Sequence, residues 1–329
     1  MPPVDFLTLT PDDVDRVQNF ASLPLYGSLD CSRSEIESRW KDEIREQLSS
    51  RGAIGLVAKI GGTMSGLAIC APLSWESPLF GKSMWAIKQI GLASGRGDVS
   101  SVATSLVAEI VRRVADRDAD FLLCKAIASD TAVIHALESH GFLLMDTLLN
   151  FVFDCRAGGS NGRQQQTPEG FTLRLATTSD IESLAAVAHA SFADHFGRFH
   201  ADPRIGHDAA TRIYQEWIRS CVNGWADWIV VAVHGDRIAG YSAWKKPSAL
   251  DARHGIRLGH YSVGAVHPDF FGRGLFTALT RAGMEELRSS ANWIEAPTHI
   301  DNHAVQRGFL RLGWRIAGAQ HSFHKWLKS

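Results

Sequence analysis

The 329-residue chain lacks long apolar runs: no stretch approaches the roughly 20 residues that a membrane-spanning helix needs. It also lacks net charge, at −1 near neutral pH, so no overall basic field attracts nucleic acid or an anionic membrane. The first residues show no basic segment followed by an apolar one, and we expect no signal peptide there. The sequence therefore predicts a cytoplasmic protein with neither a nucleic-acid nor a membrane partner.

Cysteine is scarce as well. The five cysteines are scattered along the chain and form no Cys-x-x-Cys pair. Such use is typical of a reducing compartment, where the thiol serves as a small core side chain. The 14 histidines are more numerous, but their spacing matches no common metal-binding pattern such as His-Glu-x-x-His. We therefore expect no metal site.

The chain does contain enough apolar sequence, 45%, for two hydrophobic cores in this length. The clearest boundary is a segment rich in glycine and glutamine at residues 157–168, which has no apolar periodicity. This composition is typical of a solvated linker. We predict an N-terminal domain over residues 1–156 and a C-terminal domain over residues 169–329.

The two halves carry matching landmarks in the same order. A Gly-Arg-Gly turn precedes a helical pattern in each half, at residues 95–97 and 272–274. After each turn, apolar positions step by three, four and four residues, which marks one buried helix face. A further helix follows, capped by Asp130 in one half and Asn302 in the other, and each helix ends at a glycine. The order predicts a duplicated α/β unit.

Strand patterns lie between these landmarks. Hairpins are expected near residues 54–70 and 227–244, and a further strand over about residues 257–266 leads into the second Gly-Arg-Gly turn. Antiparallel strands thus come first and a parallel crossover comes later. The predicted fold class is α/β (α+β), with two tandem domains, each a mixed, mostly antiparallel twisted sheet flanked by helices.

The second Gly-Arg-Gly turn lies where a strand ends and a helix begins. Amide hydrogens of such a turn and of the helix N-terminus converge and form an anion site. Glycines let the backbone approach the ligand, and Arg273 can contact a phosphate. A Rossmann site usually has a third glycine and comes early in a βαβ unit, and a P-loop needs Gly-Lys-Ser/Thr. A tight turn without a ligand is the remaining alternative.

The segment from Val266-His267-Pro268 to Gly272-Arg273-Gly274 resembles the acetyl-CoA loop of the GCN5-related N-acetyltransferases, in which tandem arrangements are known. Asn302, followed by Leu312-Gly313-Trp314, resembles the last motif of that family. The resemblance implies an N-acyltransferase, most simply an N-acetyltransferase, with acetyl-CoA or another acyl-CoA as co-substrate and no metal. The positions that it assigns to coenzyme binding are Gly264, Ala265, Val266, Phe271, Gly272, Arg273, Gly274, Leu275, Phe276, Thr277, Asn302, Val305 and Phe309.

Some positions depart from the family pattern. Phe276 stands where the family often has glycine or alanine, and it either crowds the pyrophosphate end or packs inward. The family's frequent proton-donating tyrosine is Phe309 here, so that role is absent or moved. In the first half, Gly95-Arg96-Gly97 lacks the preceding Val-x-Pro, and the carboxylate of Asp98 would repel a phosphate. We expect the first domain to be degenerate and non-catalytic.

Acyl transfer to an amine needs a neutral amine, a hydrogen-bond donor near the carbonyl and a proton for the thiolate. The candidate catalytic residues are His299, at the end of a predicted strand, and His260 and Tyr261. The latter two are neighbours on one strand and lie on opposite faces, so we expect one of them to face the site. Direct positioning, with protons carried by water, is the alternative.

A more diffuse resemblance, over about residues 70–329, is to members of the family that acetylate nucleotide-linked amino deoxysugars. It includes the segment from Trp75 to Gly81. It implies a small-molecule amine acceptor held by Phe192, Arg198, Phe199 and Tyr241. Other amines stay open: an amino-sugar conjugate, an antibiotic or an amino acid. A non-catalytic module that binds acyl-CoA or another protein also stays open as an alternative. The oligomeric state, monomer or homodimer, stays open as well.

Overall fold

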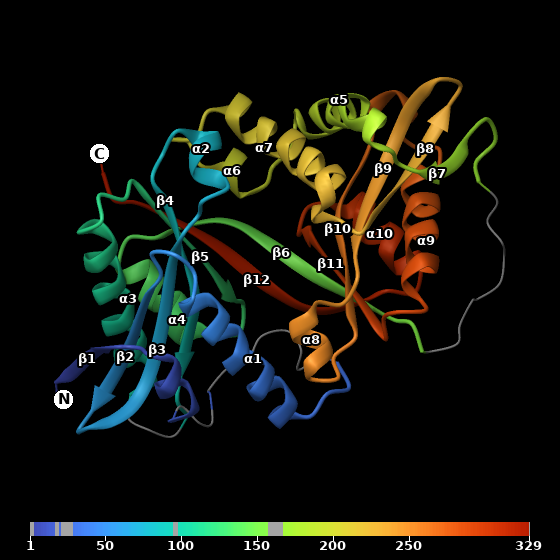
Figure 1. Cartoon of the computed structure of the whole chain (residues 1–329). Helices are drawn as coiled ribbons and strands as arrows, with labels where there is room; N and C mark the ends of the chain where they lie inside the picture. The colour runs from blue at the N-terminus through green and yellow to red at the C-terminus, as the bar shows by residue number, and fades with distance from the viewer. Residues whose placement is uncertain (1–2, 17–19, 21–28, 95–97, 157–166, 329) are drawn as a thin grey trace. The chain divides into compact units, whose positions relative to one another are not determined.

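The computed structural model describes residues 3–16, 20, 29–94, 98–156 and 167–328. The chain folds into two compact units: unit 1 holds residues 1–147 and 318–329, and unit 2 holds residues 148–317. Each unit contains a mixed sheet flanked by helices, as Figure 1 shows. The predicted fold class is therefore confirmed. In the part of the chain that the structure describes, no helix is long and apolar enough to cross a membrane.

The elements of unit 1 alternate between strands and helices. They are β1 (Val4–Thr8), a short 3-10 helix (Pro11–Arg16), α1 (Arg33–Leu48), β2 (Ile54–Ile60), β3 (Thr63–Pro72), α2 (Glu76–Phe80), β4 (Met84–Leu92), α3 (Val99–Ala115), β5 (Phe121–Ile127) and α4 (Thr131–Ser139). Strands β1 to β4 are antiparallel neighbours, and β4 runs parallel to β5. The predicted hairpin turns at Gly61 and Gly62, both with positive φ.

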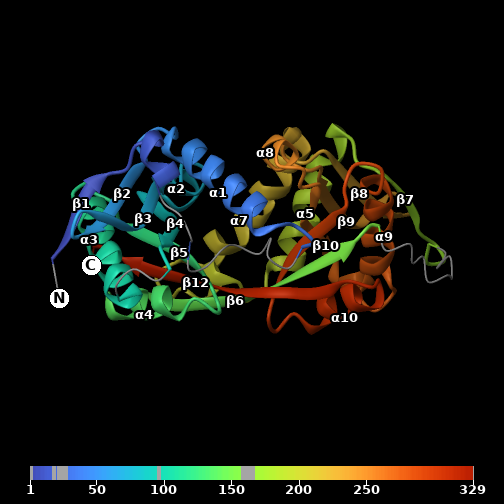
Figure 2. The ribbon, with the colours of Figure 1, turned by 90° about the horizontal axis from the view of Figure 1, so that it is seen from below.

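Helices cover both faces of the unit 1 sheet (Figure 2). On one face, Trp40 and Ile44 of α1 pack with Val57. On the other, α3 and α4 bury their predicted apolar positions against the strands, Leu106 and Leu137 among them. The step of three and four residues along α3 thus marks a buried face, as the periodicity indicates.

Unit 2 repeats this order with additional short helices. Its elements are β7 (Thr172–Leu175), a 3-10 helix (Thr178–Asp180), α5 (Ile181–Phe192), α6 (Arg198–Ala201), α7 (His207–Ser220), a π-helical turn (Cys221–Trp225), β8 (Trp228–His234), β9 (Arg237–Lys245), α8 (Ala249–Arg253), β10 (Leu258–Val266), a 3-10 helix (Pro268–Phe270), α9 (Leu275–Leu287), β11 (Trp293–His299) and α10 (His303–Arg311). Strands β7 to β10 are antiparallel, and β10 runs parallel to β11.

Two cores lie on the two faces of the unit 2 sheet. Residues of α5 and α7 pack with Tyr241 and Val263 on one face. Residues of α9 and α10 pack with Trp244 and Tyr261 on the other. Any group held between β10 and β11 therefore has a different set of side chains on each side.

The predicted helix caps are present. The Asn302 side chain accepts a hydrogen bond from the Val305 amide at 3.3 Å, and Asp130 does the same for Val133 at 3.3 Å. Gly313, beyond the end of α10, has a φ of 87°, in the region that favours glycine. Local sequence therefore defines the start and end of this helix.

The last strand of each half pairs in the other unit. Strand β6 (Leu143–Asp154) closes the first half of the sequence, yet its residues from Leu148 onward pair antiparallel with β11. Strand β12 (Arg315–Trp326) closes the second half, and its residues from Gln320 onward pair antiparallel with β5. The division between the compact units thus falls within β6 rather than at residue 156. Each unit is completed by a strand from the other half.

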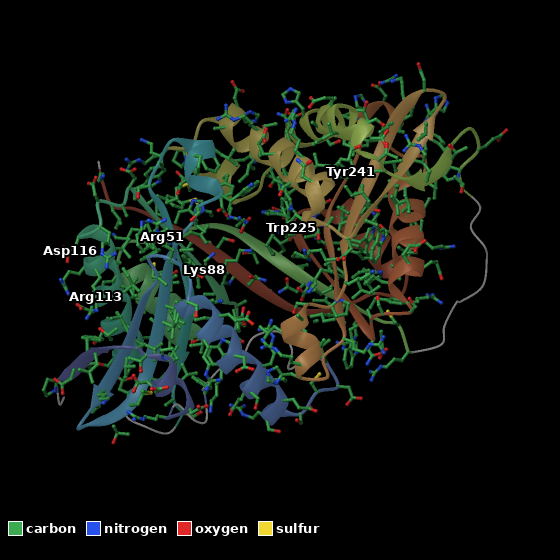
Figure 3. All side chains as sticks on the ribbon, in the orientation of Figure 1. Arg51, Lys88, Arg113, Asp116, Trp225 and Tyr241 are labelled. Atoms are coloured by element: carbon green, nitrogen blue, oxygen red, sulfur yellow. The ribbon has the colours of Figure 1, made fainter. Side chains whose placement is uncertain are left out.

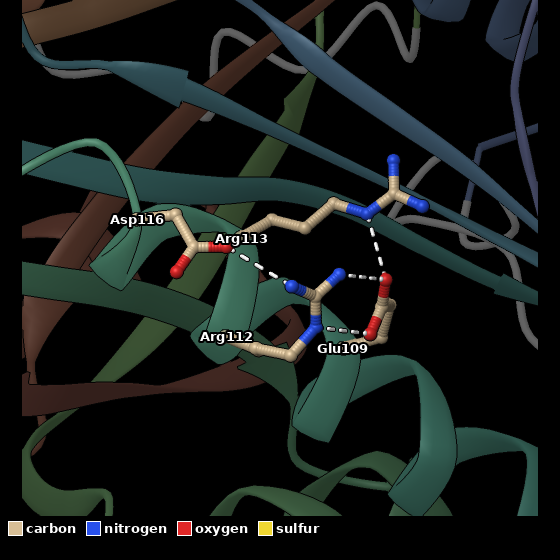
Figure 4. A network of polar contacts seen from close by, with 4 residues as sticks. All are labelled: Glu109, Arg112, Arg113 and Asp116. Atoms are coloured by element: carbon tan, nitrogen blue, oxygen red, sulfur yellow. Dashed lines mark hydrogen bonds and ion pairs between the residues drawn. The ribbon is translucent and has the colours of Figure 1, made fainter.

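A charged network lies on α3 of unit 1 (Figure 4). The Glu109 carboxylate accepts hydrogen bonds from Arg112 at 2.8 and 2.9 Å and from Arg113 at 2.7 Å, and Arg112 also reaches Asp116. The hydrogen bonds and charges of Arg112 and Arg113 lower the pKa of Glu109 to about 2, against the opposing effect of burial. This pairing therefore stabilises unit 1 at neutral pH and is lost as the pH falls toward 2.

Because the last strand of each half pairs with a strand of the other half, a core substitution in either strand should loosen its partner strand in the other half of the sequence. Phe323 of β12 belongs to the core of unit 1, and Phe151 of β6 belongs to the core of unit 2. Because Phe→Ala in a core costs about 3–5 kcal/mol, Phe323→Ala should accelerate amide exchange in β5, and Phe151→Ala in β11. Exchange can be followed by mass spectrometry. If amide hydrogen exchange became faster only in the half of the sequence that carries each substitution, the pairing of β12 with β5 and of β6 with β11 would be contradicted.

Candidate functional site

Strands β10 and β11 pair over a short stretch and then diverge. Their parallel pairing runs from Leu258↔Trp293 to His260↔Glu295. Beyond it, β10 pairs only with β9 and β11 only with β6 among the described strands, and an irregularity interrupts β10 between Tyr261 and Val263. We call this divergence the fork, with His260 and Glu295 at its apex. Backbone groups of residues 261–266 that face β11 are free of a strand partner there.

The predicted anion loop lies directly after the fork. Gly272 and Gly274 have φ of 75° and 79°, which favours glycine at both positions. A Cβ atom would meet nothing within 4 Å at Gly272, and only Pro168 at 4.0 Å at Gly274. Helix α9 starts after Gly274 without a side-chain cap. The amide hydrogens of its first turn are therefore directed at open space, as an anion site requires.

Residues outside the predicted set hold this loop in place. Ser191 on α5 donates to the Val266 carbonyl at 2.8 Å, and Arg237 on β9 pairs with Asp269 at 2.9 Å. The hydrogen bond from Arg237 and the charge of His267 lower the pKa of Asp269. Arg273 lies over the Phe270 ring, 5.6 Å from its centre. Neither Ser191 nor Arg237 was predicted to support this loop, because their contacts with it depend on the tertiary structure.

The corresponding region of unit 1 differs at the start of the helix and at the last parallel pair of the strands. The carboxylate of Asp98 caps α3 by accepting from the Ser100 amide at 3.0 Å, which places negative charge at the helix start. Residues 95–97 lie outside the described residues. The parallel pairing of β4 and β5 ends at Ile87 and Cys124, so apolar side chains occupy the apex positions.

The apex of the fork in unit 2 holds a hydrogen-bonded His–Glu pair. His260 Nδ1 lies 2.9 Å from Glu295 Oε1, with the side chains 27% and 28% exposed. Burial lowers the pKa of His260, but the hydrogen bond and charge of Glu295 and the charge of Asp251 outweigh burial and the nearby Lys245, and raise it overall. Because the carboxylate accepts from Nδ1, Nε2 of the neutral ring keeps a lone pair that can take a proton.

His299 is arranged differently. Its Nδ1 accepts a hydrogen bond from the Asp301 amide at 3.0 Å, and its ring packs against Phe196. A backbone amide can only donate, so the proton of the neutral His299 ring is on Nε2. His299 is therefore built to donate a hydrogen bond, whereas His260 is built to accept a proton. Glu295, which makes this difference, was missed by the sequence reasoning, although a carboxylate in the apolar segment Trp293–Ala296 is a usable signal.

The aromatic residues on the α9 side settle the alternatives left open for Phe276. Its ring fills the space beside Gly308, where a Cβ atom would lie 2.4 Å away, and packs 5.3 Å from the Phe309 ring. Phe276 therefore packs inward and leaves the loop open. Phe309 is fully buried in the same cluster.

The other positions assigned to the coenzyme divide into two groups. The side chain of Ala265 is buried in the core with Tyr241, and that of Leu275 in a further cluster with Phe270 and Leu279, so only their backbone atoms can contact a ligand. Phe271 is 62% exposed beside the glycines, Thr277 is half-buried in the first turn of α9, and Val305 contributes its amide to the Asn302 cap.

The residues assigned to the acceptor are also divided. Phe192 is half-buried and stacks on Tyr214 with ring centres 3.9 Å apart. Phe199 is buried beneath the guanidinium of Arg198. Tyr241, labelled in Figure 3, is 1% exposed in the α5 core, so it supports the sheet rather than reaching a ligand. Exposed aromatic side chains that the sequence reasoning missed are Phe196 and Trp225.

Two known proteins are similar in sequence to most of the chain. No family model matches the chain. It is 24% identical over 270 residues to the spore coat polysaccharide biosynthesis protein SpsD of Bacillus subtilis, covering 80% of this chain and 84% of that protein. It is 25% identical over 267 residues to dTDP-fucosamine acetyltransferase of Escherichia coli, covering 77% and 96%.

Solved structures agree over the full length. A tandem GNAT protein from the clavulanic acid biosynthesis pathway matches with a TM-score of 0.59 at 14% identity, over 99% of both chains. A GCN5-related N-acetyltransferase from Sphaerobacter thermophilus matches with a TM-score of 0.63 at 15% identity, over 100% of this chain and 98% of that one. The chain therefore has the tandem GCN5-related N-acetyltransferase fold. The predicted family and the predicted enzyme class, acetyltransferase, are confirmed.

Removing the charge of Glu295 should lower the pKa of His260. In Glu295→Gln the charged hydrogen bond is lost, and burial, which lowers the pKa, is less opposed. The shift can be measured by NMR titration of the histidine ring. Glu285→Gln is the control, because that exposed carboxylate pairs with Arg288 on α9. An unchanged His260 pKa in Glu295→Gln would refute the pairing at the apex.

Proposed function

We propose that unit 2 transfers an acetyl group from acetyl-CoA to the primary amine of a small molecule, a nucleotide-linked amino sugar. The observation that carries this proposal is the continuity of β10 with the glycine loop. One strand provides an unpaired edge at the fork and then leads into an open anion site. A ligand with phosphates at one end and a reactive group at the end of a thin arm fits that arrangement.

The residues present suit the coenzyme. Its pyrophosphate would accept hydrogen bonds from the amides at Gly272–Gly274 and the first turn of α9, with Arg273 supplying positive charge. Its arm would lie along β10 from Val266 toward Ser262, about 13 Å at 3.3 Å per residue. Amide groups of the arm can pair with the free strand edge as an added strand does. Acyl groups longer than acetyl remain compatible with the loop.

The His260–Glu295 pair provides the proton acceptor. The amine nitrogen attacks the thioester carbonyl carbon, and Nε2 of His260 takes the proton that the nitrogen then loses. Glu295 orients the ring through Nδ1 and stabilises the positive charge that develops on it. His299 Nε2–H, on β11, is available to donate to the carbonyl oxygen or to a polar group of the acceptor.

An amino-sugar acceptor is supported by the relatives, one named for dTDP-fucosamine and the other for spore coat polysaccharide. The exposed rings of Phe196 and Trp225 suit stacking against a sugar or a base. Arg198 adds a cation beside Phe199 in the same helical region. Unit 1 then has a supporting role, since Asp98 caps its helix. We place the reaction in the cytoplasm, where acetyl-CoA and nucleotide-linked sugars are both made.

Filling the loop should abolish coenzyme binding. Gly274→Trp adds a large side chain at a positive φ, and we expect acetyl-CoA affinity measured by calorimetry to fall at least tenfold. Gly62→Trp is the matched control, because Gly62 has nearly the same φ, 78°, and open space around it in unit 1. Equal affinity in the wild type and Gly274→Trp would remove the assignment of the loop.

The acceptor is tested by thiol release with a panel of amines that includes dTDP-linked amino sugars. Release with these sugars above all other amines supports the proposed function. Binding of acetyl-CoA without release from any amine would replace it with a non-catalytic binding module.

A further inference from the structure

The hydroxyl of Tyr261 lies at the fork. A Cβ atom on Gly264 would be 1.8 Å from this oxygen, so the phenol rests directly against the β10 backbone beyond the last pair with β11. Tyr261 keeps 8% of its surface exposed, whereas Tyr241, in the core on the other face, keeps 1%. Gly264 is thus required as glycine because the hydroxyl occupies the space of its side chain.

Two other ring N–H groups in the surrounding cluster are already used. Trp244 Nε1 donates to Ser242 Oγ at 2.8 Å, and that hydroxyl donates to the Leu279 carbonyl at 3.1 Å. Trp314 Nε1 is directed at the sulfur of Met284. Phe276 and Phe309, which flank Tyr261, have no polar hydrogen. The indole N–H of Trp228 also has no partner in this cluster, but it is fully buried, so among the described rings the Tyr261 O–H, which lies against the β10 backbone, is the donor placed at the fork.

We propose that Tyr261 is a second catalytic residue, which donates its phenolic proton to the sulfur of the leaving coenzyme. This inference rests on the proposed function of the fork. His260 and Tyr261 follow one another on β10 and so point to opposite faces of the sheet. Within a fully paired sheet, a ligand on one face would be out of reach of one of these side chains. A ligand in the opening between β10 and β11 can be reached from both faces.

The proton balance of the step is closed. The amine nitrogen forms a bond to the carbonyl carbon, and the C–S bond breaks with its electron pair moving to sulfur. The Tyr261 proton goes to that sulfur and gives the free thiol, while the nitrogen loses its proton to His260 Nε2. The phenolate then regains a proton from water, and His260 returns its proton to solvent. An amine and a thioester have become an amide and a thiol.

Burial supports this direction of transfer. It raises the pKa of the Tyr261 hydroxyl above its ordinary value near 10, so the phenol is fully protonated at neutral pH. Tyr261 is therefore a donor, and the alternative in which it serves as the base is not favoured. The other hydroxyls on the fork strands beyond the apex are those of Ser262 on β10, whose oxygen is fully buried, and of Thr298 on β11. Both are aliphatic alcohols and much weaker acids than a phenol.

The test is Tyr261→Phe in the full chain, assayed with acetyl-CoA and the best amine of the panel. We expect kcat to fall about 100-fold, because general acid catalysis typically contributes that much or more. The affinity for acetyl-CoA by calorimetry should change less than threefold, since the ring and its packing are kept. The split between kcat and KM supplies an independent readout: kcat should fall while KM for acetyl-CoA stays within threefold of the wild type. Thr298→Val is the control, with kcat within threefold of the wild type.

The outcomes are separable. A Tyr261→Phe variant with wild-type kcat overturns the role of Tyr261 and leaves the acetyltransferase intact. A parallel loss of kcat and acetyl-CoA affinity shows a structural role and also overturns it. A large loss of kcat in Thr298→Val alone would assign the proton to Thr298. If the wild type itself releases no thiol with any amine, the proposed function fails, and this role fails with it.

Discussion

The site depends on where the parallel pairing of β10 with β11 stops. If the ladder continued past His260 and Glu295, the backbone of residues 261–266 would be satisfied within the sheet and closed to a ligand. The irregularity between Tyr261 and Val263 ends the ladder and changes the face on which the following side chains lie. It brings Tyr261 and Gly264 to the same face, and it leaves an edge that leads from the apex to the glycine loop.

The same topology occurs in unit 1 without these side chains. Unit 1 has the same parallel pair, β4 with β5, ending at Ile87 and Cys124, and its next helix is capped by Asp98. The fold thus supplies the diverging strands in both units. What distinguishes unit 2 is the His–Glu pair, the uncapped helix start at Gly274 and the phenol over Gly264. The proposed coenzyme site of unit 2 therefore rests on these local features rather than on the topology that the two units share.

Features set by neighbouring residues could be read from the sequence, and features set by distant contacts could not. The caps at Asp130 and Asn302, the positive φ of Gly272 and Gly274 and the amphipathic helices follow from local chemistry. The pairing of Glu295 with His260 and the support from Ser191 depend on tertiary register, which no local pattern carries. The exchange of β6 and β12 is of the same kind, since either strand has the alternation to pair with β5 or β11. Tyr241 was assigned to the acceptor from the sequence, but its side chain is buried in the core between the sheet and helices α5 and α7.

The most direct test of the fork as the coenzyme site is amide hydrogen exchange with and without acetyl-CoA, resolved along the chain. We predict slower exchange at Ser262–Val266 of β10 and at Leu275–Thr277 of α9, with no change at Lys88–Leu92 of β4 or at the start of α3. Protection in unit 1, or saturating acetyl-CoA without protection along β10, would contradict it.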